Sequence, residues 1–295
     1  MQPRYLAQTQ PWEYLTADGL TLRGRHTAAP GQTLHFLSGN GFCGGVYWPL
    51  LRRLPSQYRL FVHDIEGHGD SDAPAGFSGI NTTLARVRAV MAEQGLDRAP
   101  MIGMGHSFGG ALTLKLAADH PGLFQALVLL DPILLPPPHW WAFRLSSWLH
   151  RNPMAQGARR RRTLWASRDE VVERLRGRGI YRGWSEEALE SFADHATRDT
   201  PQGRALCCPV EVEAQIFEHP VYVWRLLRTL RIPVLFLYGD QSYAFFPAAA
   251  RLARRLNPRV ETHTAPGGHC FMLEDPQAAA QAIARFLAVQ TSGGL

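Results

Sequence analysis

Short runs of apolar residues recur along the chain and predict buried β-strands. Their hydrophobicity is continuous rather than alternating, which is typical of strands that are covered on both faces in a parallel sheet. The runs are LHFLS (34–38), LFVHD (60–64), PMIGMG (100–105), ALVLLD (126–131), PVLFLYG (233–239) and RVETHTA (259–265).

Stretches that resemble amphipathic helices lie between several of these runs, as in TTLARVRAVMAEQG, SFGGALTLKLAADH and PQAAAQAIARFLAVQ. Asp275 is placed to cap the last of these helices, which Pro276 begins. Because strand and helix alternate, we predict the α/β class, with a mostly parallel central sheet flanked by helices.

The alternation fails between about residues 132 and 231. This segment opens with three prolines at 136–138, which end any regular element, and continues with helical patterns rich in tryptophan and arginine. The strand pattern resumes at Pro233. We therefore predict a core domain made of residues 1–131 and 232–295, with a helical cap inserted at 132–231.

Composition and charge narrow the class of protein. With 295 residues and 45% hydrophobic content, the chain is long enough for a well-buried core. The formal net charge is +6, but much of the basic excess lies in one stretch, HRNPMAQGARRRRTLW. No nucleic-acid-binding module accompanies these arginines, so we expect no nucleic-acid partner. We interpret them as a solvated helix face or as an attraction for an anionic substrate.

Targeting and metal-binding signals are missing from the sequence. No apolar run approaches the length of a membrane span, and the opening MQPRYLAQTQ lacks the apolar stretch of a signal peptide. The four cysteines match neither a disulfide framework nor a zinc-site spacing. We therefore expect a cytoplasmic protein without a membrane span, cofactor or metal, either a monomer or a homodimer.

The segment GHSFG, from Gly105 to Gly109, fits the pattern G-x-S-x-G between a predicted strand and a predicted helix. A serine on so sharp a turn needs neighbours without side chains, and the N-terminus of the following helix stabilises negative charge that forms nearby. Ser107 is therefore the candidate nucleophile. The alternative is an ordinary strand-to-helix turn.

A serine hydroxyl is a weak nucleophile and needs a base. His269 lies in a glycine-rich loop after the last predicted strand, and the chain order of nucleophile, acid and histidine suits this kind of turn. His106 is a poor substitute, because adjacent side chains on such a turn point apart. His269 is therefore the candidate base.

Together, GHSFGG, GGHCFMLEDP and DIEGHGDSD resemble the motifs of the α/β-hydrolase fold superfamily in their order and context. The resemblance covers nearly all of the chain, although the sequence of the cap itself resembles no family, and it implies a serine hydrolase of the esterase or lipase type with a cap. In that superfamily, DIEGHGDSD is a structural turn. We therefore do not expect a metal site at its His63, Asp64, His68 and Asp70.

The resemblance also implies an oxyanion hole formed by two backbone N–H groups. One belongs to the residue after the nucleophile, here Phe108, and the other comes from a loop after an early strand. That loop is LSGNGF in this chain, which makes Asn40 the second donor. Ser38 stands where the superfamily usually has a histidine.

Two aspartates are candidates for the acid. Members of the superfamily commonly carry it in a Gly-x-x-Asp pattern after the penultimate strand, but the matching residue here is Ser242, and Asp240 stands two residues earlier. Other members place the acid after the preceding core strand, where this chain has Asp131, 24 residues after Ser107. Either carboxylate can orient the imidazole of His269 if it reaches Nδ1. We favour Asp131 and keep Asp240 as the alternative.

These residues predict a serine hydrolase that cleaves an ester or related acyl bond of a small, apolar substrate through an acyl-enzyme intermediate. Cys43, His106, Trp140 and Trp141 are predicted to contact that substrate. Two alternatives stay open, because fold alone does not separate these functions. One is a C–C bond hydrolase or lyase of the same fold, and the other is a ligand-binding receptor with vestigial hydrolysis.

Overall fold

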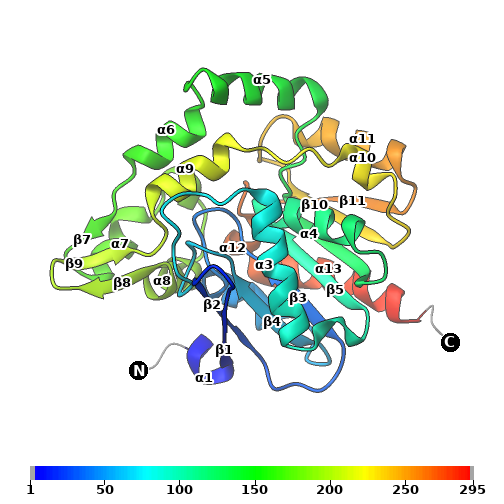
Figure 1. Cartoon of the computed structure of the whole chain (residues 1–295), viewed down its shortest axis with the longest axis horizontal. Helices are drawn as coiled ribbons and strands as arrows, with labels where there is room; N and C mark the ends of the chain where they lie inside the picture. The colour runs from blue at the N-terminus through cyan, green and yellow to red at the C-terminus, as the bar shows by residue number, and fades with distance from the viewer. Residues whose placement is uncertain (1–3, 293–295) are drawn as a thin grey trace.

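A central sheet of eight strands organises the computed structural model, which describes residues 4–292 (Figure 1). The strand order is β1-β2-β4-β3-β5-β6-β10-β11, and the strands from β4 to β11 in this order run parallel to their neighbours. Each apolar run forms one of these parallel strands, which confirms the predicted α/β class. The strands are β1 (Gln10–Leu15), β2 (Thr21–His26), β3 (Thr33–Leu37), β4 (Arg59–Asp64), β5 (Met101–His106), β6 (Phe124–Leu130), β10 (Val234–Gly239) and β11 (Val260–Ala265).

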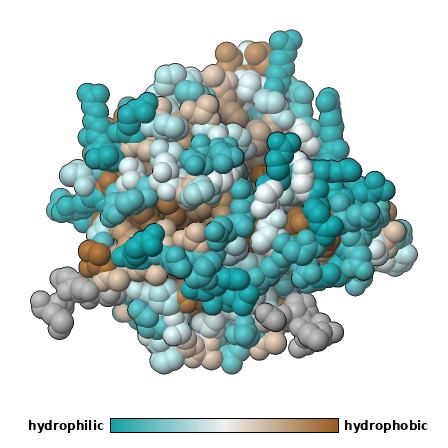
Figure 2. All heavy atoms as spheres, turned by 180° about the vertical axis from the view of Figure 1, so that it is seen from behind, coloured by the Kyte–Doolittle hydropathy of each residue, from teal (hydrophilic) through white to brown (hydrophobic). Residues whose placement is uncertain are grey.

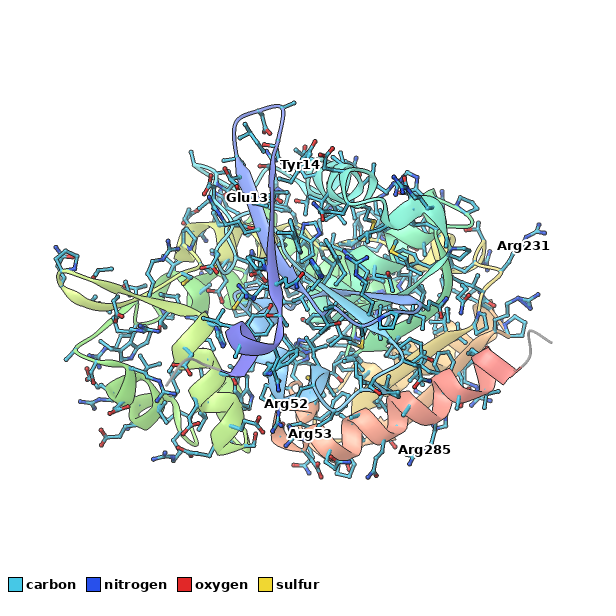
Figure 3. The ribbon with its side chains drawn as sticks, turned by 90° about the horizontal axis from the view of Figure 1, so that it is seen from below. Glu13, Tyr14, Arg52, Arg53, Arg231 and Arg285 are labelled. Atoms are coloured by element: carbon cyan, nitrogen blue, oxygen red, sulfur yellow. The ribbon has the colours of Figure 1, made fainter. Side chains whose placement is uncertain are left out.

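The first two strands form an antiparallel hairpin that the apolar runs did not predict. Its sequences, QPWEYL and TLRGRH, are mostly polar, and only Trp12 of β1 and Leu22 and Gly24 of β2 are buried. Figure 3 shows this hairpin projecting beyond the rest of the sheet. Trp12 lies against β4 beside Gly24, where no side chain is in the way. A Cβ at this glycine would come within 2.2 Å of the carbonyl oxygen of Val62 on β4, which is too close for any side chain.

Helices cover both faces of the sheet and divide the core into two layers (Figure 1). On one face α2 and α13 pack against residues such as Val128 of β6, and on the other face α3, α4 and α11 pack against residues such as Leu129. Consecutive residues of a strand point to opposite faces, so β6 contributes to both layers. The helices are α1 (Arg4–Gln8), α2 (Trp48–Leu51), α3 (Ile80–Glu93), α4 (Ser107–Asp119), α11 (Phe246–Leu256), α12 (Phe271–Glu274) and α13 (Pro276–Ser292), with 3₁₀ turns η1 (Gly44–Tyr47) and η2 (Leu96–Arg98).

The segment between β6 and β10 contains the predicted cap, and the prediction that it is helical was incomplete. Its strands β7, β9 and β8 form a small antiparallel sheet. These strands have only two to four residues, so they lack the apolar runs that marked the central strands. The elements are α5 (Pro137–Trp148), α6 (Pro153–Arg160), β7 (Leu164–Trp165), α7 (Arg168–Leu175), η3 (Gly179–Tyr181), α8 (Glu186–His195), β8 (Thr197–Thr200), β9 (Gly203–Leu206), α9 (Val210–Glu218) and α10 (Trp224–Leu227).

Ion pairs join this segment to the core. Arg52 and Arg53, which follow α2 and are labelled in Figure 3, contact the carboxylate of Glu187 on α8 at 2.6 Å and 3.1 Å. Both arginines are about a quarter exposed, so the shared carboxylate lies at the rim of the contact between the two parts.

The last helix of the segment belongs to the core layers. Trp224 and Leu227 of α10 are buried with the residues of α4 and α11. The boundaries of the cap at 132–231 stay a prediction, and residues 1–3 and 293–295 of the predicted core lie outside the described residues. Among the described helices, none is both long enough and apolar enough to cross a lipid bilayer.

Candidate active site

Ser107 stands on a sharp turn between β5, which ends at His106, and α4, which Ser107 begins. Its φ of 54° lies in the left-handed region, which residues other than glycine rarely adopt. The flanking glycines leave room for this backbone. A Cβ on Gly105 would lie 2.5 Å from the carbonyl carbon of Gly109, and a Cβ on Gly109 would lie 2.3 Å from the carbonyl oxygen of Leu37.

His269 lies between Ser107 and Asp131. Its Nε2 is 3.0 Å from the Oγ of Ser107, and its Nδ1 is 2.6 Å from the Oδ2 of Asp131. The Asp131 side chain is fully buried, whereas 11% of the His269 side chain is exposed. When Nδ1–H donates to the carboxylate, Nε2 is left to accept the hydroxyl proton of Ser107, which is the arrangement that activates a serine.

Asp131 follows β6 with a φ of 43°, the same unusual region as Ser107. Its Oδ1 accepts a hydrogen bond from the last backbone N–H of β10 at 2.8 Å, and the hydroxyl of Ser242 donates to its Oδ2. Asp240, the alternative acid, instead accepts a hydrogen bond from the backbone N–H of Gly267 at 3.0 Å. Of the two candidates, Asp131 is therefore the one that lies against the histidine, and its role as the acid stays a prediction.

The loop after β3 carries Asn40 to the candidate site. Ser38 closes this loop, because its hydroxyl donates to the carbonyl oxygen of Phe42 at 3.0 Å. The side-chain amide of Asn40 donates to the carbonyl oxygen of Glu213 on α9 at 2.9 Å, which ties the loop to the cap segment. The side-chain oxygen of Asn40 is buried, and no hydrogen-bond partner for it exists among the described residues.

A chain of hydrogen bonds runs behind the candidate site through His106 and Tyr47, both of which are fully buried. The N–H of Gly39 donates to the Tyr47 hydroxyl at 3.2 Å, and that hydroxyl donates to Nδ1 of His106 at 2.7 Å, because the proton of the neutral ring is on Nε2. Nε2–H of His106 then donates to the backbone carbonyl oxygen of His269 at 2.9 Å. Burial lowers the pKa of His106 well below its ordinary value, which keeps the ring neutral, as both bonds require.

A cavity of about 460 Å³ opens beside Ser107, within the range typical of small-molecule sites. Asn40 and Phe108, the two predicted oxyanion-hole residues, both line it. No aspartate, glutamate, lysine or arginine is among the described residues of its wall. Burial raises the pKa of Tyr243, which is also part of the wall, to about 12, so its hydroxyl stays neutral.

The cap segment supplies most of the apolar wall, which the sequence analysis did not identify. Its residues on α5 recur at spacings of three and four, the signal of one helix face, and this periodicity could have revealed them. The wall residues from this segment are Ile133, Leu135, His139, Ala142, Phe143, Ser146, Pro153, Met154, Ile180, Ile216, Phe217, His219, Pro220 and Val221.

Comparison with known proteins identifies the family. A profile of the family described as alpha/beta hydrolase fold matches residues 33–276. The chain belongs to the alpha/beta hydrolase fold family. It is 27% identical over 264 residues to the pimeloyl-[acyl-carrier protein] methyl ester esterase of Stenotrophomonas maltophilia, an alignment that covers 88% of this chain and 93% of that esterase.

Two further similarities are more distant. A stretch of 108 residues of this alpha/beta hydrolase is 33% identical to the type I acyl-CoA thioesterase mpaH of Penicillium roqueforti, which covers 35% of this chain and only 22% of that protein. The fold is similar to the crystal structure of E-2-(acetamidomethylene)succinate hydrolase, with a TM-score of 0.78 and 22% identity over 95% of this chain and 99% of that chain.

The four residues predicted to contact the substrate lie outside the cavity wall of this alpha/beta hydrolase. Cys43 is buried and its Sγ donates to a backbone carbonyl of α8 at 3.1 Å. His106 is enclosed in the hydrogen-bonded chain described above. Trp140 donates to a backbone carbonyl of the cap segment at 3.2 Å, and Trp141 is 65% exposed. The face of α5 that lines the cavity is a different one from that of the two tryptophans, and a contact of these four residues with substrate stays a prediction.

In this alpha/beta hydrolase the DIEGHGDSD segment supports the loop that carries Asn40. Nε2 of His68 accepts a hydrogen bond from the N–H of Gly41 at 3.0 Å, and Oδ1 of Asp64 accepts one from the N–H of Gly44 at 2.7 Å. Burial lowers the pKa of His68 to about 4, so the ring remains an acceptor. Within residues 4–292 no group of three or more His, Cys, Asp or Glu side chains is arranged to hold a metal ion.

Proposed function

We propose that this protein is a serine hydrolase that cleaves an ester or thioester of an uncharged, apolar acyl chain. The observation that carries the proposal is the contact of one imidazole with two groups, the Ser107 hydroxyl at 3.0 Å and the Asp131 carboxylate at 2.6 Å, beside an apolar cavity. The names of the two relatives above, an ester hydrolase and a thioester hydrolase, agree with acyl transfer to water.

Acylation uses each of these groups. Oγ of Ser107 attacks the carbonyl carbon while Nε2 of His269 takes its proton, and the Asp131 side chain beside Nδ1 stabilises the resulting imidazolium. The backbone N–H groups of Asn40 and Phe108 donate to the oxyanion, assisted by the N-terminus of α4. The imidazolium then gives its proton to the leaving alcohol or thiol, and the acyl group stays on the serine.

Deacylation repeats these chemical steps with water as the nucleophile. Nε2 of His269 takes a proton from the water, which attacks the acyl carbon, and the same two N–H groups hold the second oxyanion. The imidazolium returns the proton to Ser107, and the free carboxylic acid leaves.

The cavity wall and the basic residues around it favour an uncharged acyl chain. Several arginines of the basic stretch have carboxylate partners: Arg159 pairs with Glu211 and Glu218. Arg161 contacts Glu213 at 2.7 Å. These pairs oppose the interpretation that the basic stretch attracts an anionic substrate, and no lysine or arginine is among the described residues of the wall to pair with a buried substrate carboxylate.

Acyl p-nitrophenyl esters and acyl-CoA thioesters of graded chain length test the proposal. We expect turnover of the apolar chains, and we expect Ser107→Ala to lower kcat by at least roughly a thousandfold. Ser146→Ala is the matched control, since Ser146 lines the same cavity and its hydroxyl bonds only within α5. Mass spectrometry of the quenched reaction should find the acyl group on the peptide that contains Ser107.

Two outcomes would contradict the proposal. Turnover that persists in Ser107→Ala would exclude the acyl-enzyme route through this serine. Labelling of Ser107 by a fluorophosphonate without turnover of any ester or thioester would favour the ligand-binding alternative instead.

A further inference from the structure

Four large apolar side chains are exposed on the outer side of α5 and its C-terminal end. Trp141 is 65% exposed, Leu145 55%, Trp148 75% and Leu149 45%. Their spacing of four, three and one residues places them on one face of the helix. We refer to these four residues as the α5 patch.

Packing within the molecule does not explain the α5 patch. The opposite face of α5 carries Ala142, Phe143 and Ser146, which line the cavity beside Ser107. The helix therefore presents apolar residues on both sides, one toward the cavity and one toward solvent. A contiguous apolar surface that is open to water marks a site of contact with another phase or molecule.

The carboxylates of the neighbouring helix α9 are paired with Arg159 and Arg161, which leaves arginines as the unpaired charges beside the α5 patch. Residues 132–168 contain no aspartate or glutamate, and Arg144 and Arg151 beside the patch form no ion pair with any described residue. Figure 2 shows hydrophobic side chains projecting at the top of the molecule, where α5 lies in Figure 1, next to strongly hydrophilic ones. The arginines of this segment are Arg144, Arg151, Arg159, Arg160, Arg161, Arg162 and Arg168.

We propose that the α5 patch docks this protein onto an anionic lipid surface. Tryptophan and leucine on one face with flanking arginines are the composition of a helix that lies in the plane of a membrane interface. A second copy of the chain fits less well, because a two-fold contact through this patch would bring the two sets of arginines together. Docking in this way sets the wall of the cavity directly beneath the lipid.

Flotation with lipid vesicles tests the docking without using activity. Vesicles of equal parts phosphatidylcholine and phosphatidylglycerol should carry the wild-type chain to the top of the gradient, and the triple variant Trp141→Ser, Leu145→Ser, Trp148→Ser should bind roughly tenfold less. The control variant, Leu15→Ser with Val289→Ser, should float like the wild type. Its two side chains are as exposed, at 67% and 69%, but lie elsewhere.

The electrostatic part of the inference has its own variant. Arg144→Gln with Arg151→Gln should weaken binding to the anionic vesicles and reduce its dependence on salt, while pure phosphatidylcholine vesicles should bind every variant weakly. Near-ultraviolet circular dichroism of each variant checks that the fold is intact. Ser107→Ala should float like the wild type, so a failed hydrolase proposal leaves this result unaffected.

Three results would overturn the docking inference. The wild-type chain could stay at the bottom of the gradient with anionic vesicles. The folded triple variant could float as well as the wild type. A concentration-dependent dimer in sedimentation velocity, lost in the triple variant and unaccompanied by flotation, would assign the α5 patch to a second copy of the chain.

Discussion

The hydroxyl of Tyr47 lies 2.7 Å from Nδ1 of His106, and this pair connects the two loops that meet at the candidate nucleophile. On one side the Tyr47 oxygen accepts the N–H of Gly39, next to Asn40, and on the other His106 donates to the backbone of His269. Tyr47 and His106 are fully buried, so the bond between them is hard to replace by water. The positions of Asn40, the candidate oxyanion donor, and of His269, the candidate base, are thus linked by one network.

Removal of the Tyr47 hydroxyl should disturb the position of Asn40 relative to His269. We expect Tyr47→Phe to lower kcat roughly tenfold to a hundredfold with little change in KM, because a small displacement of oxyanion donors mainly affects the transition state. Tyr58→Phe is the control, since the hydroxyl of Tyr58 is buried without a hydrogen-bond partner among the described residues. Equal steady-state kinetics for Tyr47→Phe and the wild type would show that the network has no positioning role.

The two aspartates should differ sharply in their effect on turnover. We expect Asp131→Asn to lower kcat by roughly ten-thousandfold, because an amide beside Nδ1 neither stabilises imidazolium nor keeps the required tautomer. Asp240→Asn should lower it by less than about tenfold, since Asp240 only bonds the backbone of Gly267. Steady-state kinetics of both variants decide the assignment, and near-full activity of Asp131→Asn would reject it.

The glycines of the turn around Ser107 should tolerate no side chain. A Cβ on Gly109 would lie 2.3 Å from one backbone oxygen and 2.4 Å from another, so we expect Gly109→Ala to lower the free energy of unfolding by about 1–3 kcal/mol. Gly157→Ala is the matched control. It stands in α6 with nothing within 4 Å of the added Cβ, so it should raise that free energy by up to about 1 kcal/mol. Thermal and urea denaturation measure both.

Burial of His35 should make the stability depend on pH. Burial lowers the pKa of His35 to about 3 in the folded protein, from an ordinary value of 6.5. Between these two pH values only the unfolded chain carries a proton on both ring nitrogens of His35. The free energy of unfolding should therefore fall as the pH falls from 6.5. We expect His35→Phe to reduce the loss between about pH 6.5 and pH 4.5 by about 2 kcal/mol.

Urea denaturation at the two pH values checks this expectation. Asp64 acts in the opposite direction, because burial raises its pKa to about 7, but this contribution is common to both proteins and cancels in the comparison. The control is His120→Phe at an exposed position. An equal loss of stability on acidification in wild type and His35→Phe would contradict the argument.

Local patterns were sufficient for the six parallel strands of the central sheet and for the positions of Ser107, His269 and Asp131. Each of these three residues directly follows a buried strand or lies in the loop after one, and strand ends of a parallel sheet meet at one edge. These local signals are reliable because the buried apolar runs determine which segments form the sheet. The sheet in turn determines where the ends of its strands lie.

Other features depend on contacts that the sequence does not display. Tyr47 lies in an apolar segment without a motif, and its partner His106 is 59 residues away. The small sheet of the cap segment has strands that are too short to give a hydrophobic pattern. Trp140 and Trp141 do not line the cavity, because the way in which α5 packs on the core decides which face of the helix meets the cavity.

Both Ser107 and Asp131 hold backbone angles that glycine adopts at much lower cost, with φ of 54° and 43°. Thermal stability and turnover therefore favour different residues at these two positions. A directed-evolution campaign that selects survivors of heating alone would tend to enrich glycine at both, and under the proposed mechanism its most robust products would be inert.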